Sequence, residues 1–208
     1  MTEAQPYYLH LEGMDFAGKS VVAESFISNT NDRWQIWNNT IAPHIDNSIA
    51  ILADKLQQEG IFDSDIHGML YNAAIVAEIR SFKSPLINTI QDSCGILRSL
   101  AYHIVTGKER LEAELKYYQT EFPRFDSSFI LTANHQARMA RLALRKERGE
   151  KVSEHDLMFL KYPDKFYAME RCLVALTSQL FCGKVIDTSD MTVDQVVQKI
   201  NAQISTHA

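Results

Sequence analysis

The sequence predicts an α/β fold with a five-stranded parallel sheet flanked by helices. Short runs of β-favouring residues alternate along the chain with longer segments in which apolar residues recur every three or four positions. The 208 residues include only 8 glycines and 5 prolines, which disfavours turn-rich all-β architectures. Strands that alternate with helices form a parallel sheet covered on both faces, and ligands bind beyond the carboxyl ends of its strands.

The first three predicted strands are separated by helices. Aromatic and aliphatic residues predict strands at 7–11 and 34–37. A third strand is predicted at 86–91, although Asn88 and Thr89 make it more polar than a fully buried parallel strand usually is. Apolar residues at three- and four-residue steps predict the intervening helices at 19–27, 45–60 and 66–82.

The second half of the chain continues the alternation. The run 127–132 predicts a fourth strand, and Gly183 opens a fifth strand at 184–187. The longest helix is expected to bend at Pro163, because proline removes a backbone hydrogen bond. Helices are predicted at 97–105, 109–120, 138–148, 153–180 and 193–204.

Composition and charge limit the classes of protein to which the chain can belong. The length suits one domain, and the net charge of −5 gives no general attraction to nucleic acids or anionic membranes. No segment resembles a signal peptide or reaches the roughly 20 apolar residues of a membrane span. The three cysteines lack CxxC spacing, as expected for reduced thiols. We therefore expect a single soluble, cytoplasmic domain over 1–208 that binds any anion at a local site.

A phosphate-binding motif follows the first predicted strand. Residues 13–20 read Gly-Met-Asp-Phe-Ala-Gly-Lys-Ser, a complete GxxxxGK[ST] between a strand and a helix. Its glycines allow backbone N–H groups to surround a polyphosphate, while Lys19 reaches the β- and γ-phosphates and Ser20 binds Mg²⁺. The alternative is a glycine turn that caps an ordinary crossover. The motif predicts ATP and Mg²⁺ as cofactors, held by Gly13, Phe16, Ala17, Gly18, Lys19, Ser20 and Val21.

The run from Leu9 to Ser20 resembles the start of thymidylate kinases and of the related deoxynucleoside kinases. Further similar segments follow in the same order over nearly the whole chain. They are Leu-Tyr-Asn-Ala-Ala at 70–74, Asp92 with Ser-Leu-Ala-Tyr-His at 99–103, the lid-like segment and following helix at 138–159, and Val-Ile-Asp-Thr-Ser at 185–189. The resemblance implies a three-layer P-loop NTPase fold with a short helical lid over about 138–152, a nucleotide or nucleoside-like substrate, and a homodimer formed through the helices beside the acceptor pocket.

The resemblance also implies roles for individual residues. Tyr71 and Tyr102 are expected to bind the acceptor, and Arg98, or alternatively Arg80, is expected to bind it in place of a missing family arginine. Thr188 is expected beside the adenine of ATP. However, the arginine that follows the strand-three aspartate in thymidylate kinases is Ser93 here. Other acceptor-phosphate arginines of that family are missing as well. A phosphate dianion without arginine partners binds weakly, which favours an acceptor with a free hydroxyl group.

Three carboxylates are candidates for the reaction itself. The resemblance to deoxynucleoside kinases implies that Glu12 is the catalytic base, and the alternative is a residue that orders the loop or the magnesium shell. Asp15 is expected to bind an acceptor hydroxyl or a magnesium-bound water, unless it is a solvated loop carboxylate. Asp92, at the end of a strand, is expected to help bind Mg²⁺, and its alternative role is a helix N-cap.

Positive charge is concentrated in the lid-like segment of an otherwise acidic chain. Phosphoryl transfer needs cations on the migrating group. Arg141 and Arg145 are four residues apart and share a helical face, so we expect them to act in catalysis; a solvated helix side is the alternative. The sequence therefore predicts an ATP-dependent kinase for a nucleotide or nucleoside-type acceptor. Two alternatives are a kinase for another hydroxyl metabolite and a non-catalytic nucleotide-binding regulator.

Overall fold

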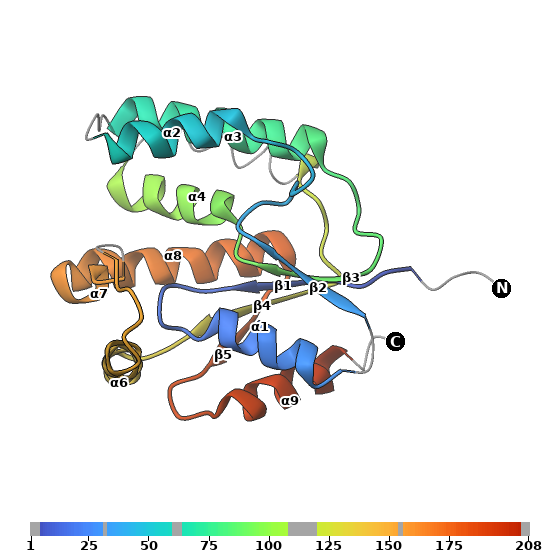
Figure 1. Cartoon of the computed structure of the whole chain (residues 1–208), viewed down its shortest axis with the longest axis vertical. Coiled ribbons are helices and arrows are strands. Elements are labelled where there is room, and N and C mark those ends of the chain that lie inside the picture. Colours follow the sequence, from blue (N-terminus) through green and yellow to red (C-terminus); the bar gives the residue numbers. More distant parts are fainter. Residues whose placement is uncertain (1–4, 31–32, 60–63, 108–119, 154–155, 205–208) are drawn as a thin grey trace.

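The structure is a computed structural model that describes residues 5–30, 33–59, 64–107, 120–153 and 156–204. Five parallel strands form one sheet in the order β2-β3-β1-β4-β5 (Figure 1). The predicted α/β fold with a parallel sheet is confirmed. The strands are β1 (Tyr8–Glu12), β2 (Trp34–Asn38), β3 (Asn88–Asp92), β4 (Ser127–Thr132) and β5 (Lys184–Asp187).

Helices cover both faces of the sheet. Helices α1 (Lys19–Ser28) and α9 (Val193–Ile204) cover one face, and α4 (Gly95–Thr106) and α8 (Pro163–Phe181) cover the other. Helices α2 (Ser48–Gln58) and α3 (Ser64–Ser81) pack together outside α4 (Figure 1). The remaining helices are α6 (His135–Glu147) and α7 (Met158–Lys161). No helix of the described segments is both long and apolar enough to cross a membrane.

The two faces of the sheet differ in chemistry. Side chains such as Leu9, Leu11 and Phe129 form an apolar layer with α1 and α9. On the other face, β1 turns His10 and Glu12 inward, and both are fully buried. The His10 ring stacks on Phe125 with 4.4 Å between the ring centroids. A polar strip therefore leads along the centre of the sheet to the end of β1, where the phosphate motif begins.

The polar residues of the third strand are compatible with its inner position in the sheet. The Thr89 hydroxyl donates to the Ile87 carbonyl at 2.8 Å and accepts a hydrogen bond from Gln35. The Asn88 side chain accepts a hydrogen bond from the backbone N–H of Tyr7 at 2.9 Å. Because these groups are paired, burying them does not leave an unsatisfied donor or acceptor.

The predicted long helix at 153–180 is wrong in one respect. The chain forms two helices there, because Tyr162 leaves the helical conformation with φ −139° and ψ 60°. Pro163 then begins α8 at its first position, where its missing N–H costs no hydrogen bond. The proline starts a new helix rather than bending an existing one. The predicted helix at 109–120 lies almost entirely outside the described residues.

Candidate active site

The phosphate motif forms a tight loop between β1 and α1. Gly13 and Gly18 have φ values of 149° and 96°, which side chains rarely tolerate, and Phe16 also has a positive φ of 59°. A Cβ atom on Gly13 would lie 2.3 Å from the carbonyl oxygen of Leu131 in β4. The loop therefore lies so close to the backbone of β4 that only glycine fits at its first position.

Lys19 points back into the loop. Its Nζ donates to the carbonyl of Gly13 at 2.7 Å and lies 3.4 Å from the carbonyl of Met14. Burial and the nearby guanidinium of Arg98 lower the pKa of this lysine, although the surrounding carboxylates oppose the effect. A buried ammonium group held by carbonyl oxygens is well placed to exchange them for phosphate oxygens.

Ser20 and Asp92 come together from different elements. The Ser20 hydroxyl is in the first turn of α1, and Asp92 is the last residue of β3. The hydroxyl donates a hydrogen bond of 2.8 Å to Asp92 Oδ2. Within the described segments, no group of three or more histidine, cysteine or acidic side chains could hold a metal alone. A hydroxyl and a carboxylate next to a phosphate loop fit Mg²⁺, which binds one or two protein oxygens together with substrate phosphates.

The Glu12 carboxylate has both oxygens occupied. Oε1 accepts from the N–H of Gly13 and Oε2 from the N–H of Cys94, both at 2.9 Å. His10 Nε2 lies 3.7 Å from Oε2. Burial alone would raise the pKa of Glu12, but His10 and the charges of Arg98 and Lys19 outweigh burial and lower the pKa to about 2. This geometry suits a charged anchor that joins the loop to the end of β3.

Arg98 reaches the loop from α4. Its Nη2 donates to the Gly13 carbonyl at 2.8 Å, and its Nη1 lies 3.5 Å from Asp15 Oδ1. Its Nε lies 3.6 Å from Glu12 Oε1. Asp15 is partly exposed at the boundary between the loop and the pocket described below.

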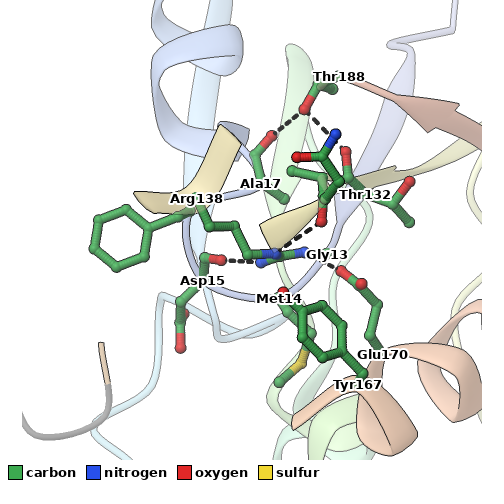
Figure 2. A network of polar contacts seen from close by, with 12 residues as sticks. Gly13, Met14, Asp15, Ala17, Thr132, Arg138, Tyr167, Glu170 and Thr188 are labelled. Carbon is green, nitrogen blue, oxygen red and sulfur yellow. Dashed lines mark hydrogen bonds and ion pairs between the residues drawn. The ribbon is translucent and has the colours of Figure 1, made fainter. Parts of the chain in front are cut away.

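The buried arginine of the lid-like segment was not singled out by sequence. Arg138 is fully buried and donates to the Ala133 carbonyl at 2.9 Å. The same guanidinium donates to the Asp15 carbonyl and pairs with Glu170 of α8 (Figure 2). Its carbon lies 4.9 Å from the ring centre of Phe166. Arg138 thus fixes the first turn of α6 to the phosphate loop and to α8.

The two arginines predicted to act in catalysis also lie over the phosphate loop. Arg141 donates to the Phe16 carbonyl at 2.8 Å and to the Thr188 carbonyl at 2.7 Å. The Thr188 hydroxyl donates in turn to the Ala17 carbonyl at 2.9 Å. Arg145 lies 5.8 Å from the ring centre of Phe16 and pairs with Asp156 at 3.1 Å. Val21, by contrast, has a mostly exposed side chain on α1.

A pocket of about 730 Å³ opens beside the loop. The three residues predicted to bind the acceptor, Tyr71, Arg98 and Tyr102, all line it. The apolar part of its wall comes mainly from α3, α4 and α8. Sequence reasoning missed two charged lining residues, Glu78 and Lys165, because helical spacing does not reveal which face borders a cavity. The apolar lining residues include Ile41, Ala74, Ile75, Ile96, Phe122 and Phe166.

Comparison of the fold with solved structures gives long matches. A Candida albicans thymidylate kinase matches with a TM-score of 0.69 and 16% identity, covering 99% of this chain and 94% of that one. A deoxyadenosine kinase from M. mycoides, solved with dCMP and dCDP, matches with a TM-score of 0.58 and 14% identity. That match covers 97% of this chain and all of the kinase. The chain has the fold of these P-loop kinases.

A second structure of the same deoxyadenosine kinase, with bound dCTP, gives a TM-score of 0.57 at 13% identity over 96% of this chain and 99% of that one. No protein-family model and no curated protein matches the sequence. The P-loop kinase fold is therefore recognisable in three dimensions at a level of identity where overall sequence similarity has faded.

Proposed function

We propose that this protein is an ATP- and Mg²⁺-dependent phosphotransferase that moves the γ-phosphoryl group of ATP to a small nucleoside-type or nucleotide-type acceptor. The observation that carries the proposal is the direct contact between a phosphate loop and a pocket of about 730 Å³. Small-molecule pockets usually measure roughly 300–1,000 Å³, so the cavity suits an acceptor of nucleoside size.

The residues of the loop divide the work between binding and chemistry. The backbone N–H groups of 13–20 hold the phosphates of ATP, and Lys19, Arg141 and Arg145 balance their charge. Arg145 must exchange its acidic partners Asp156 and Glu150 for phosphate to do so. Ser20 and Asp92 hold Mg²⁺, which neutralises phosphate charge when it is bound.

The two carboxylates near the loop have different parts in this proposal. Glu12 orders the loop, because both its oxygens are bound to backbone N–H groups and its low pKa makes it a poor base. Asp15 faces the pocket and is only loosely paired, with 3.5 Å between Oδ1 and Arg98. A carboxylate in this position can accept the proton of an acceptor hydroxyl.

The charges of the pocket favour an acceptor without a phosphate group. The charged residues that line it within the described chain are two acids, Asp15 and Glu78, and two bases, Arg98 and Lys165. The buried, ionised Glu12 behind Arg98 adds a further negative charge. A dianionic monophosphate would find no surplus of positive charge there, whereas a neutral hydroxyl compound would bury its apolar surface without that cost.

An ADP-release assay over matched nucleosides and nucleoside monophosphates tests the proposal. We expect turnover with Mg²⁺ and ATP that depends on an acceptor, higher kcat/KM for the nucleosides, and none in Lys19→Ala. Retained turnover in Lys19→Ala would contradict the assignment of the loop. Tight ATP binding without transfer to any acceptor would instead indicate a nucleotide-binding regulator, and faster transfer to monophosphates would overturn the acceptor class.

A further inference from the structure

Two cations converge on one carbonyl oxygen of the phosphate loop. Lys19 Nζ lies 2.7 Å and Arg98 Nη2 lies 2.8 Å from the Gly13 oxygen. Both distances end at the same atom, so the two charged nitrogens are at most about 5.5 Å apart. An ammonium and a guanidinium this close repel each other, and the carboxylates of Glu12 and Asp15 beside them offset that repulsion.

The two cations approach from opposite sides. Lys19 begins α1 behind the loop and does not line the pocket, whereas Arg98 comes from α4 and does. Among the residues that the structure describes, Arg98 is the one arginine in the pocket wall. The lid-like segment contributes no arginine to that wall, since Arg141 is held by Phe16 and Thr188. A phosphoryl group on its way from the loop to the pocket would pass Arg98.

Arg98 also has unused hydrogen-bonding capacity. Its buried Nε donates to no acceptor within hydrogen-bond distance among the described residues. Its two carboxylate neighbours lie at 3.6 Å and 3.5 Å, beyond the usual range of an N–H···O bond. A guanidinium with five N–H groups, one of which donates a short hydrogen bond to the Gly13 carbonyl, can donate to a further oxygen ligand without losing that bond.

We propose that Arg98 is a catalytic residue that binds the γ-phosphoryl group from the acceptor side, opposite Lys19. The inference rests on the proposed phosphotransferase function. As the acceptor oxygen bonds to the γ-phosphorus, the bond from that phosphorus to the β,γ-bridging oxygen breaks and ADP leaves with the electron pair. The hydroxyl proton passes to Asp15. Arg98 balances the charge on the transferring group, and its bond to the Gly13 carbonyl keeps that oxygen paired when Lys19 moves to phosphate.

The test compares two nucleotides that differ in the γ-phosphoryl group. Calorimetry in the presence of Mg²⁺ measures the affinities of ADP and of the non-hydrolysable ATP analogue AMP-PNP for wild type, Arg98→Gln and Arg98→Lys. We expect Arg98→Gln to weaken AMP-PNP binding about tenfold and to leave ADP binding within about twofold, as for loss of one charge-assisted contact. Arg98→Lys keeps the charge without the planar fork, so its loss for AMP-PNP is expected to be intermediate.

The matched control is Arg80→Gln in the last turn of α3. Arg80 is an exposed arginine outside the pocket wall that pairs with Glu121 at 3.9 Å. Its substitution should leave both affinities unchanged. If Arg98→Gln weakens the binding of ADP and of AMP-PNP equally, Arg98 only supports the loop. If it weakens the binding of neither nucleotide, Arg98 does not contact the γ-phosphoryl group. Either result overturns the inference. If Arg98→Gln does not fold, Arg98→Lys gives the same comparison.

Kinetics separate this inference from the proposed function. With an active acceptor, Arg98→Gln should lower kcat by about 10³ while the KM for ATP changes much less, because an arginine on the transferring group acts mainly in the transition state. If the wild-type protein transfers phosphate to no acceptor but Arg98→Gln still binds AMP-PNP more weakly than wild type does, the proposed function fails and the contact between Arg98 and the γ-phosphoryl group stands. If wild type is active and Arg98→Gln keeps its kcat, the catalytic role of Arg98 fails alone.

Discussion

Replacing Glu12 with glutamine is expected to destabilise the fold rather than simply remove a catalytic base. The native pKa of Glu12 is lowered from 4.5 to about 2, with burial opposing the change and His10, Arg98 and Lys19 producing it. Each pH unit by which a pKa is lowered corresponds to about 1.4 kcal/mol, so ionisation of this carboxyl contributes about 3 kcal/mol to folding at pH 7. Glutamine cannot carry that charge, and its amide nitrogen cannot accept the second backbone hydrogen bond.

The contribution of Glu12 to folding stability is expected to fall as the pH is lowered. Because the native pKa lies below the unfolded one, the contribution is complete above about pH 4.5 and is lost as the pH falls towards about 2. Urea unfolding of wild type and Glu12→Gln at a series of pH values measures the difference directly, and comparison at equal pH cancels the other titrating groups. We expect about 3 kcal/mol at pH 7 and less than about half of that at pH 3.

Two results would refute this reasoning. A difference that stays constant between pH 7 and pH 3 would show that the pKa of Glu12 is the same in the native and the unfolded state. A variant as stable as wild type but without transfer activity would show that Glu12 is the base after all. Asp15→Asn serves as the matched comparison, since Asp15 is partly exposed and should affect transfer more than stability.

Three further substitutions have defined outcomes. Gly13→Ala should reduce nucleotide affinity at least tenfold by calorimetry, because its Cβ would collide with the backbone of β4; Gly107→Ala, also at positive φ but with open space around it, should not change affinity. Asp92→Asn should abolish the Mg²⁺ dependence of ATP binding while binding in EDTA persists, and an unchanged dependence would exclude its metal role. Arg138→Met should cost about 3–5 kcal/mol in urea unfolding by leaving Glu170 buried and unpaired, and adding Glu170→Met should recover part of that loss.

Local sequence patterns predicted the strands and the phosphate loop well. The run 127–132 carries its own β-favouring signal, and it coincides with β4. The glycine spacing of the phosphate motif is a local requirement of the backbone, so sequence could reveal it. Pro163 shows the limit of such reasoning, because proline can either bend a helix or begin one and only packing decides between them.

The groups that surround the loop were less predictable, since they come from distant parts of the chain. The N–H of Cys94 binds Glu12 across 82 positions, and Arg138 finds Glu170 on another helix. A buried arginine has no sequence signal, because arginine in a basic, amphipathic segment is usually exposed. His10 had none either, since it interrupts an apolar strand and meets partners such as Ser128, 2.8 Å away on the neighbouring strand, only in the folded structure.

The phosphate loop has a consequence for how the chain matures on the ribosome. Residues 13–20 emerge early, but the hydrogen bonds that support them come from Cys94, Arg98, Arg138 and finally Thr188, whose hydroxyl reaches Ala17 across 171 positions. A growing chain that lacks these partners contains the phosphate motif but not the contacts that hold its loop in shape. A nucleotide bound at the loop can therefore stabilise the fold only after Thr188 has been synthesised, so its binding would not guide the first steps of folding.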